Sequence, residues 1–344
     1  MNSAAFRLPA EWEPQAGVVI AWPHDQTDWA DRLAAVEATY VALVAAITRF
    51  EPVLICAADS TIRDHATALL HASAVDLAHV RFVDIEYDDT WLRDSGPISL
   101  INGQTYQLND FRFTGWGGKF NASRDDRLVG GLIARNLFAS AEHRRIDWAL
   151  EGGAIESDGA GTLLTTWRCL HQRHPEQSRE QMNRIFAEHL GAERVLWLEH
   201  GYLQGDDTDA HIDTLARFAP DNVIVFQGCD DPDDPHFDEL ARMRDELGSL
   251  KNARGEPYHL QPLPWANPIL DDGRRLAASY ANYLIVNDGV LVPAYGDPAD
   301  AEAARVIAAA HPNRSVVQVP CRPLIWQNGS LHCVTMQLPR GLLA

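Results

Sequence analysis

Short apolar runs rich in β-branched residues alternate, along this chain of 344 residues, with longer segments in which apolar residues recur every three or four positions. The short runs are typical of buried strands, and the longer segments are typical of amphipathic helices. The clearest helix is predicted at 31–50, because Leu33, Val36, Tyr40 and Leu43 fall on one face. Weaker patterns predict helices at 61–71, 127–137, 176–190, 237–250 and 298–311. Strands are predicted at 17–22, 52–56, 97–100, 162–166, 194–198, 222–226, 283–286, 290–293, 316–319 and 333–338.

The predicted strands flank the predicted helices at uneven intervals from one end of the chain to the other. No linker rich in Gly and Ser, no low-complexity segment and no change in composition divides the sequence. Such an alternation of strands and helices is typical of α/β proteins. We therefore expect a single α/β domain over residues 1–344, although periodicity alone does not distinguish an open sheet from a closed ring.

The charge of the chain is unbalanced, with 48 Asp and Glu against 29 Lys and Arg and a formal net charge of −19. Nucleic acids and anionic membranes bind basic surfaces, so the balance argues against both partners. It is compatible with a site that collects small cations, and equally with acidity that serves solubility.

Cysteine usage and the N-terminal segment indicate a cytoplasmic protein. The five cysteines form no CxxC pair and no disulfide framework. The N-terminus lacks a basic head followed by a long apolar core, and no apolar run approaches the roughly 18 residues that span a bilayer.

Metal and nucleotide motifs are weak, so no metal and no cofactor is predicted. The acidic run at 206–213 departs from an EF-hand loop, because Ala210 stands where that loop has Gly and no Glu closes it. A zinc site would need further His or Cys residues at ligand spacing, and the sequence contains no such cluster beside this run. The Gly-rich segments match neither a phosphate loop nor a dinucleotide fingerprint.

Cys333 is the candidate nucleophile. A thiolate is the strongest nucleophile among the standard side chains near neutral pH. His332 precedes Cys333, and the small residues Asn328, Gly329 and Ser330 suit a loop that approaches a ligand. The alternative is a buried structural thiol, which is the usual state of a cysteine.

Asp94 and Asp213 are candidates to bind a guanidinium group. Two carboxylates can grip the planar fork of guanidinium donors from different edges. Asp94 could instead form a turn with the Ser-Gly-Pro that follows, and Asp213 could cap the next helical run.

His211 is the candidate proton carrier. It would point to the same face as Asp213 if the segment is extended, and an imidazole can move protons at neutral pH. Glu151 could orient this imidazole, with the glycines that follow allowing close approach. The alternatives are a surface histidine and a solvated glutamate at a turn.

Taken in order, the motifs resemble the agmatine deiminase family, within the wider guanidine-modifying group that includes a bacterial type of peptidylarginine deiminase. The resemblance covers nearly the whole chain, through the motifs at 8–14, 21–23, 89–97, 113–119, 151–153, 161–166, 206–213, 279–282, 292–293 and 331–335.

The resemblance implies a five-bladed, pseudo-symmetric α/β propeller of the pentein type, and a hydrolase that needs no metal or cofactor. It implies Cys333 as nucleophile, His211 as proton carrier and Glu151 as the carboxylate that orients the histidine. It also implies that Asp94 and Asp213 bind the guanidinium, and that Trp91 is a wall of the pocket. Deamination of agmatine would pass through an amidino-thioether on Cys333 and yield N-carbamoylputrescine and ammonia.

Arginine, peptidylarginine or another guanidine remain alternative substrates, and a non-catalytic guanidine- or polyamine-binding protein is an alternative function. The departures from the family pattern concern the substrate. The family has a Gly-rich stretch where this chain has Gln327 to Ser330, and Asp207 replaces a Glu that could reach the distal amine of the substrate. Ala210 and Thr114 replace a Gly and an Asn. The family also implies a dimer or larger homo-oligomer.

Overall fold

Five small mixed sheets and the helices between them build the chain. The computed structural model describes residues 6–344. The first sheet has the order β18 (Met336–Pro339), β1 (Gln15–Ala21), β2 (Val53–Ala57) and β3 (Val80–Asp84). The second is β4 (Ile98–Asn102), β5 (Thr105–Arg112) and β6 (Ala141–Ala149), and the third is β7 (Ile155–Ser157), β8 (Thr162–Thr166) and β9 (Arg194–Leu198). The fourth is β10 (Ala216–Ala219), β11 (Val223–Gln227) and β12 (His259–Leu263), and the fifth is β15 (Leu284–Val286), β16 (Gly289–Ala294) and β17 (Ser315–Pro320). A short ribbon of β13 (Leu270–Asp271) and β14 (Arg274–Arg275) adds to these.

All five sheets share one pairing pattern. The strands β1, β5, β8, β11 and β16 each pair antiparallel with one neighbour and parallel with the other. A parallel pair requires a crossover connection, which is usually a helix. Here the crossovers contain α1 (Leu33–Ile47), α5 (Leu128–Ala134), α6 (Trp167–Arg173) with α7 (Arg179–Leu190), α8 (Phe237–Ser249) and α9 (Asp300–Ala310). The first sheet adds α2 (Ser60–Ala72) before β3, and its strand β18 brings the C-terminal segment beside β1.

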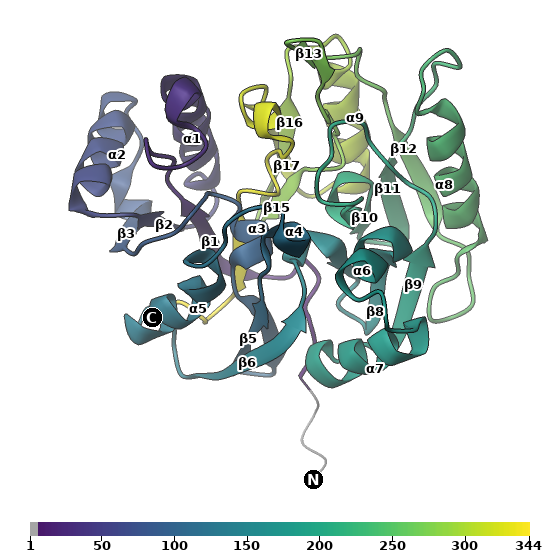
Figure 1. Cartoon of the computed structure of the whole chain (residues 1–344), viewed down its shortest axis with the longest axis horizontal. Helices are drawn as coiled ribbons and strands as arrows, with labels where there is room; N and C mark the ends of the chain where they lie inside the picture. The colour runs from purple at the N-terminus through teal and green to yellow at the C-terminus, as the bar shows by residue number, and fades with distance from the viewer. Residues whose placement is uncertain (1–5) are drawn as a thin grey trace.

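The short helices α3 (Leu92–Ser95) and α4 (Gly115–Gly118) lie near the middle of the view in Figure 1, while α1, α2, α7 and α8 lie toward its outside. The described residues also form the 3-10 turns η1 (Ala30–Arg32), η2 (Leu77–His79), η3 (Asp125–Arg127), η4 (Gly152–Ala154), η5 (Ile212–Thr214) and η6 (Leu324–Gln327). Most of the candidate site residues predicted from the sequence lie in loops or in these single turns, which is where functional residues are often placed on a rigid scaffold.

The predicted α/β alternation is confirmed, and each predicted strand and helix overlaps an observed one. The predicted last strand begins too early, because β18 begins at Met336 and Cys333 lies in the turn before it. The sequence pattern does not predict strands β3, β5, β6, β7, β10, β12, β13 and β14 or helices α3, α4 and α6. In β6 the reason is a run of exposed polar residues at the start of the strand, which hides the apolar signal.

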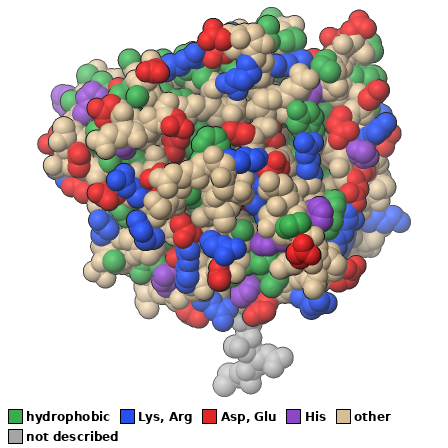
Figure 2. Space-filling view, viewed as in Figure 1, with side chains coloured by type: hydrophobic (Ala, Val, Ile, Leu, Met, Phe, Trp, Pro, Cys, Tyr) green, Lys and Arg blue, Asp and Glu red, His purple; other side chains and the backbone are tan. Residues whose placement is uncertain are grey.

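Acidic and basic side chains are intermixed on the face shown in Figure 2, and neither gathers into one large patch there. Within residues 6–344, every helix is too short or too polar to span a bilayer.

Candidate active site

An acidic cavity of about 490 Å³ lies beside α3, α4 and η6. Six aspartates line it, at positions Asp28, Asp88, Asp89, Asp94, Asp125 and Asp207, and no Lys or Arg of residues 6–344 is among the lining side chains. Aromatic side chains complete the wall, at Trp91, Trp116, Phe120 and Trp326. Burial raises the pKa of Asp89 and of Asp125 to about 7, so these two side chains are partly protonated, and partly uncharged, near neutral pH. The cavity suits a slender cation with an apolar chain.

Cys333 lies at this cavity, 4% exposed. Its backbone carbonyl accepts a hydrogen bond from the Arg93 amide at 3.1 Å, and the Asn282 side-chain amide lies 3.3 Å from Sγ through Nδ2. Burial, with Asp213 and Asp94 nearby, raises the pKa of the Cys333 thiol well above its ordinary value. The free protein therefore holds a protonated thiol at the base of an acidic cavity.

Asp94 is held rigidly at the same cavity. It lies in the single turn α3, and Gly153 N donates to Oδ1 at 3.0 Å while Trp116 Nε1 donates to Oδ2 at 2.9 Å. Burial, with Asp213 and Glu151 nearby, outweighs the effect of His211 and raises the Asp94 pKa to about 6. The alternative of a local turn bonded by its own side chain is wrong, because both of these partners are distant in sequence.

Asp213 lies behind Cys333, with Oδ2 3.8 Å from Sγ. His332 lies between two carboxylates, with Nδ1 2.8 Å from this Oδ2 and Nε2 2.7 Å from Glu11 Oε2, both at hydrogen-bond distance. Burial alone would raise the Asp213 pKa, but His332 holds it below its ordinary value. The other oxygen, Oδ1, is buried without a hydrogen-bond partner, so Asp213 keeps one acceptor for a cation.

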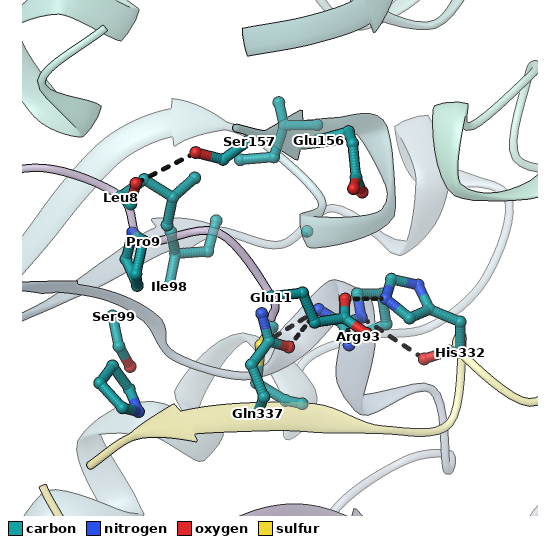
Figure 3. Close-up of a pocket in the computed structure, with 14 residues that line it drawn as sticks. Leu8, Pro9, Glu11, Arg93, Ile98, Ser99, Glu156, Ser157, His332 and Gln337 are labelled. Atoms are coloured by element: carbon teal, nitrogen blue, oxygen red, sulfur yellow. Dashed lines mark hydrogen bonds and ion pairs between the residues drawn. The ribbon is translucent and has the colours of Figure 1, made fainter. Parts of the chain in front are cut away.

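Glu11 anchors this support from behind, where Figure 3 shows it bonded to His332. Arg217 Nη2 donates to Glu11 Oε2 at 2.7 Å, and Ile285 N donates to Oε1 at 2.7 Å. Burial alone would raise the Glu11 pKa, but Arg217 and His332 hold it far below its ordinary value. Arg93 lies in the same region and bonds Gln337 Oε1 at 2.6 Å. A buried charge network thus fixes the segment that carries the thiol.

His211 is fully buried, so the alternative of a surface histidine is wrong. Its Nδ1 lies 3.6 Å from Asp94 Oδ1, its Nε2 lies 3.7 Å from Glu151 Oε2, and neither nitrogen makes a hydrogen bond. Burial alone would lower the His211 pKa, but Asp94 and further neighbours raise it well above its ordinary value. The protonated imidazole is therefore favoured, as a proton donor requires.

The expectation that His211 and Asp213 share the face of an extended segment is wrong, because Asp213 lies in the 3-10 turn η5. The two side chains converge nevertheless, around Gly153. A Cβ atom at position 153 would lie 2.6 Å from His211 Nδ1, 2.9 Å from Asp94 Oδ1 and 3.1 Å from Asp213 Oδ2. The expected need for glycine after Glu151 is thereby confirmed.

Glu151 is buried beside His211, so the alternative of a solvated glutamate is also wrong. Its Oε1 accepts from Arg173 Nε at 2.7 Å. Burial alone would raise the Glu151 pKa, but His211 and Arg173 lower it. Arg173 was not predicted as a site residue from the sequence.

Cys169 is a second site residue that the sequence did not predict. Its sulfur, a His211 nitrogen and a Glu151 oxygen all lie within 4.8 Å of one another.

Trp91 and Asp207 both line the cavity. Gly329 packs on the Trp91 ring, and Asn328 Nδ2 donates to Asp207 Oδ2 at 2.8 Å. The Gln327–Gly329 segment therefore forms a wall of the cavity. The departure of this segment from the family pattern thus lies at the candidate site. Ser330 does not line the cavity, because its buried hydroxyl bonds Tyr295 at 2.9 Å.

The sequence motifs contained further site residues whose roles were not assigned. Asn282, Trp116, Glu11 and His332 lie in quoted motifs, yet only the fold brings them to Cys333, Asp94 and Asp213. The motifs could have identified these residues as candidates. The sequence could not show which of them contact one another, because they are far apart along the chain.

Comparison with known proteins agrees with this geometry. A family model described as Porphyromonas-type peptidyl-arginine deiminase matches residues 7–339. The agmatine deiminase of Stutzerimonas stutzeri (strain A1501) is 34% identical, over 97% of this chain and 95% of that protein. A solved structure from Porphyromonas gingivalis, provisionally named an arginine deiminase, is 43% identical with a TM-score of 0.92, over 99% of this chain and 100% of that one. A cysteine-to-serine variant of C. jejuni agmatine deiminase with substrate bound is 32% identical with a TM-score of 0.90, over 98% and 97% of the two chains. The chain therefore belongs to the family of agmatine deiminases and Porphyromonas-type peptidyl-arginine deiminases.

Proposed function

We propose that this chain is a guanidine iminohydrolase that converts agmatine to N-carbamoylputrescine and ammonia. The observation that carries the proposal is a buried thiol, Cys333, at a cavity lined by six aspartates and aromatic side chains. The full-length agmatine deiminase relatives support the same substrate.

In the proposed reaction, the guanidinium group lies between Asp94 and the free oxygen of Asp213. The Cys333 sulfur forms a bond to the guanidinium carbon, and the carbon–nitrogen bond breaks as His211 gives its proton to the departing ammonia. Water then adds to the amidino carbon, with His211 as base. The carbon–sulfur bond breaks with the sulfur leaving as thiolate, while His211 keeps the proton that it took from water. The ureido product leaves, and the thiolate regains a proton from solvent. Alignment of nucleophile and substrate contributes about 7 kcal/mol or more to such a step.

The cationic substrate also ionises its own nucleophile. In the free protein, burial and two carboxylates raise the pKa of the Cys333 thiol. A guanidinium bound between those carboxylates places a positive charge beside the sulfur, and a nearby opposite charge favours the thiolate. Substrate binding thus favours the thiolate, and the thiol proton is released to solvent.

Agmatine suits the cavity better than arginine does. A free arginine carries a carboxylate that needs a cationic partner. Arg93 bonds Gln337 and the His332 carbonyl behind the site, and Arg112 pairs with Asp147 on the surface. Neither lines the cavity, whereas Asp207 offers a carboxylate to a distal ammonium.

The repeated sheets support the architecture implied by the family. Five sheets with one pairing pattern suit five blades of an α/β propeller in a single domain over 1–344, and the pairing of β18 with β1 suits a closed ring. A homo-oligomer, a cytoplasmic location, and the absence of nucleic-acid and membrane partners stay predictions from the sequence.

The test is a substrate panel of agmatine, arginine and a peptidylarginine, scored for ammonia and for ureido product. We expect agmatine to give the highest kcat/KM, with no turnover in Cys333→Ser and normal turnover in the control Cys229→Ser. Turnover that survives in Cys333→Ser would rule out the covalent route. A protein that binds guanidines tightly but turns over none of them is a binding protein and not an enzyme.

A further inference from the structure

A second thiol lies close to the proposed proton carrier. We infer that Cys169, His211 and Glu151 form a binding site for a thiophilic divalent cation such as Zn²⁺, and that the bound cation inhibits turnover. The binding itself is independent of the proposed function, whereas the inhibition rests on it. The cation is an inhibitor here and takes no part in the reaction.

The geometry of the three donors suits such a cation. Cys169 Sγ, a nitrogen of His211 and an oxygen of Glu151 lie within 4.8 Å of one another. His211 Nε2 is 3.7 Å from Glu151 Oε2, which is too long for a hydrogen bond. Two such ligands of a tetrahedral zinc ion, each about 2.0 to 2.1 Å from the metal, are roughly 3.4 Å apart. A small movement of either side chain therefore admits a metal ion.

Unsatisfied polar atoms point to the same ligand. His211 Nε2 and Glu151 Oε2 have no hydrogen-bond partner, and both side chains are only 1% exposed. Buried polar atoms are nearly always paired, since an unpaired one has lost its hydrogen bonds to water without replacement. A bound cation satisfies the nitrogen and the oxygen together.

The donor types favour zinc over the harder cations. Thiolate and imidazole are preferred by Zn²⁺ and Co²⁺, whereas Mg²⁺ and Ca²⁺ prefer oxygen. Three protein ligands leave one tetrahedral position for water. Binding releases the thiol proton of Cys169, and His211 binds as neutral imidazole. The second oxygen of Glu151 stays paired with Arg173 at 2.7 Å, which fixes the carboxylate.

The position of Asp94 indicates how a cation could reach the site and why it would inhibit turnover. This carboxylate lines the cavity and lies 3.6 Å from His211 Nδ1, so the site is one side chain behind the cavity wall. A cation on His211 Nε2 prevents the ring from taking up a second proton. The N–H that is left on Nδ1, which faces Asp94, is then a far weaker acid than an imidazolium and cannot protonate the departing ammonia. Bound substrate fills the cavity, and we expect it to slow entry of the cation.

The binding test uses Co²⁺ as a probe in the Cys333→Ser background, which removes the other thiol of the site. We expect a thiolate-to-cobalt charge-transfer band in Cys333→Ser, its loss in Cys333→Ser/Cys169→Ser, and its retention in the control Cys333→Ser/Cys229→Ser. Circular dichroism establishes that each variant is folded, and Cys169→Ala replaces Cys169→Ser if the serine is not tolerated. A band that persists without Cys169, or the lack of any band in Cys333→Ser, overturns the site.

The inhibition test measures agmatine turnover against Zn²⁺ concentration, with reversal by a chelator. Loss of Cys169 is expected to weaken inhibition at least tenfold, while Cys229→Ser leaves it unchanged. Equal inhibition of wild type and Cys169→Ser overturns the inference. Because the cobalt band requires no turnover, failure of the proposed function and failure of the metal site give different results.

Discussion

Gly329→Ala probes the contact between the loop before the nucleophile and the Trp91 wall. A Cβ atom at position 329 would lie 2.1 Å from Trp91 Cζ3 and 2.6 Å from Cη2. Carbon atoms in contact are about 3.5 to 4.0 Å apart, so the ring or the loop must move by about 1.5 Å. The ring has little room, because Trp29 packs on it at 5.7 Å between centroids and is itself bonded to Thr90.

This displacement should lower both the stability of the protein and its rate of turnover. Overpacking of this kind costs about 1 to 3 kcal/mol of stability. A displacement of about 1 Å at a reacting site can cost about 100-fold in rate, and the Gln327–Gly329 segment lies on the same cavity as Cys333. We therefore expect kcat/KM for agmatine, measured by ammonia release, to fall by roughly two orders of magnitude, and the melting temperature to fall with it.

The matched control is Gly130→Ala in α5, where a Cβ atom meets nothing within 4 Å. Alanine is preferred to glycine in helices by about 1 kcal/mol, so this variant should be equally active and no less stable. Wild-type kcat/KM in Gly329→Ala would refute the argument that the loop and Trp91 together shape the site.

The remaining predictions concern the charges around the site. Asp94→Asn removes one charge from the guanidinium site, and a lost charge-assisted bond of about 1.5 to 3 kcal/mol predicts a kcat/KM lower by roughly 10- to 100-fold at about pH 8. The Asp94 pKa is raised to about 6, so the ionised form is present above that pH. Wild-type kcat/KM should therefore fall as the pH drops through 6, and a pH–rate profile of Asp94→Asn that keeps the same fall assigns it to another group. Glu11→Gln leaves Arg217 and His332 buried with less counter-charge, which predicts a loss of about 3 to 5 kcal/mol in denaturant unfolding. The control Glu13→Gln alters a partly exposed pair with Arg7 and should cost at most about 1 kcal/mol; equal losses in the two variants would contradict a special role for the buried network.

The sequence was sufficient for the elements with a strong apolar period. The stripe of Val36, Tyr40 and Leu43 faces the core in α1, and β2 and β11 are buried along their whole length. It was insufficient for strands such as β6, in which Arg144, Arg145 and other exposed residues break the period. A strand held mainly by backbone pairing to its neighbour leaves no such signal in its own side chains.

The motifs also selected the candidate site residues and indicated the family. Cys333 and the carboxylates Asp94 and Asp213 follow from what a guanidinium group needs, and the order of the motifs determined the family. These properties are local, because the type of a side chain and its immediate neighbours in the chain decide them.

Only the tertiary structure decided which groups meet. Glu11 reaches Asp213 through His332 across more than half of the chain, and Cys169 lies beside His211 although 42 positions separate their numbers. The pKa of each group depends on such encounters and on burial, which no short segment contains. The sequence by itself identified the candidate residues and the family, and the packing of the five sheets determined the protonation of those residues and the distances between them.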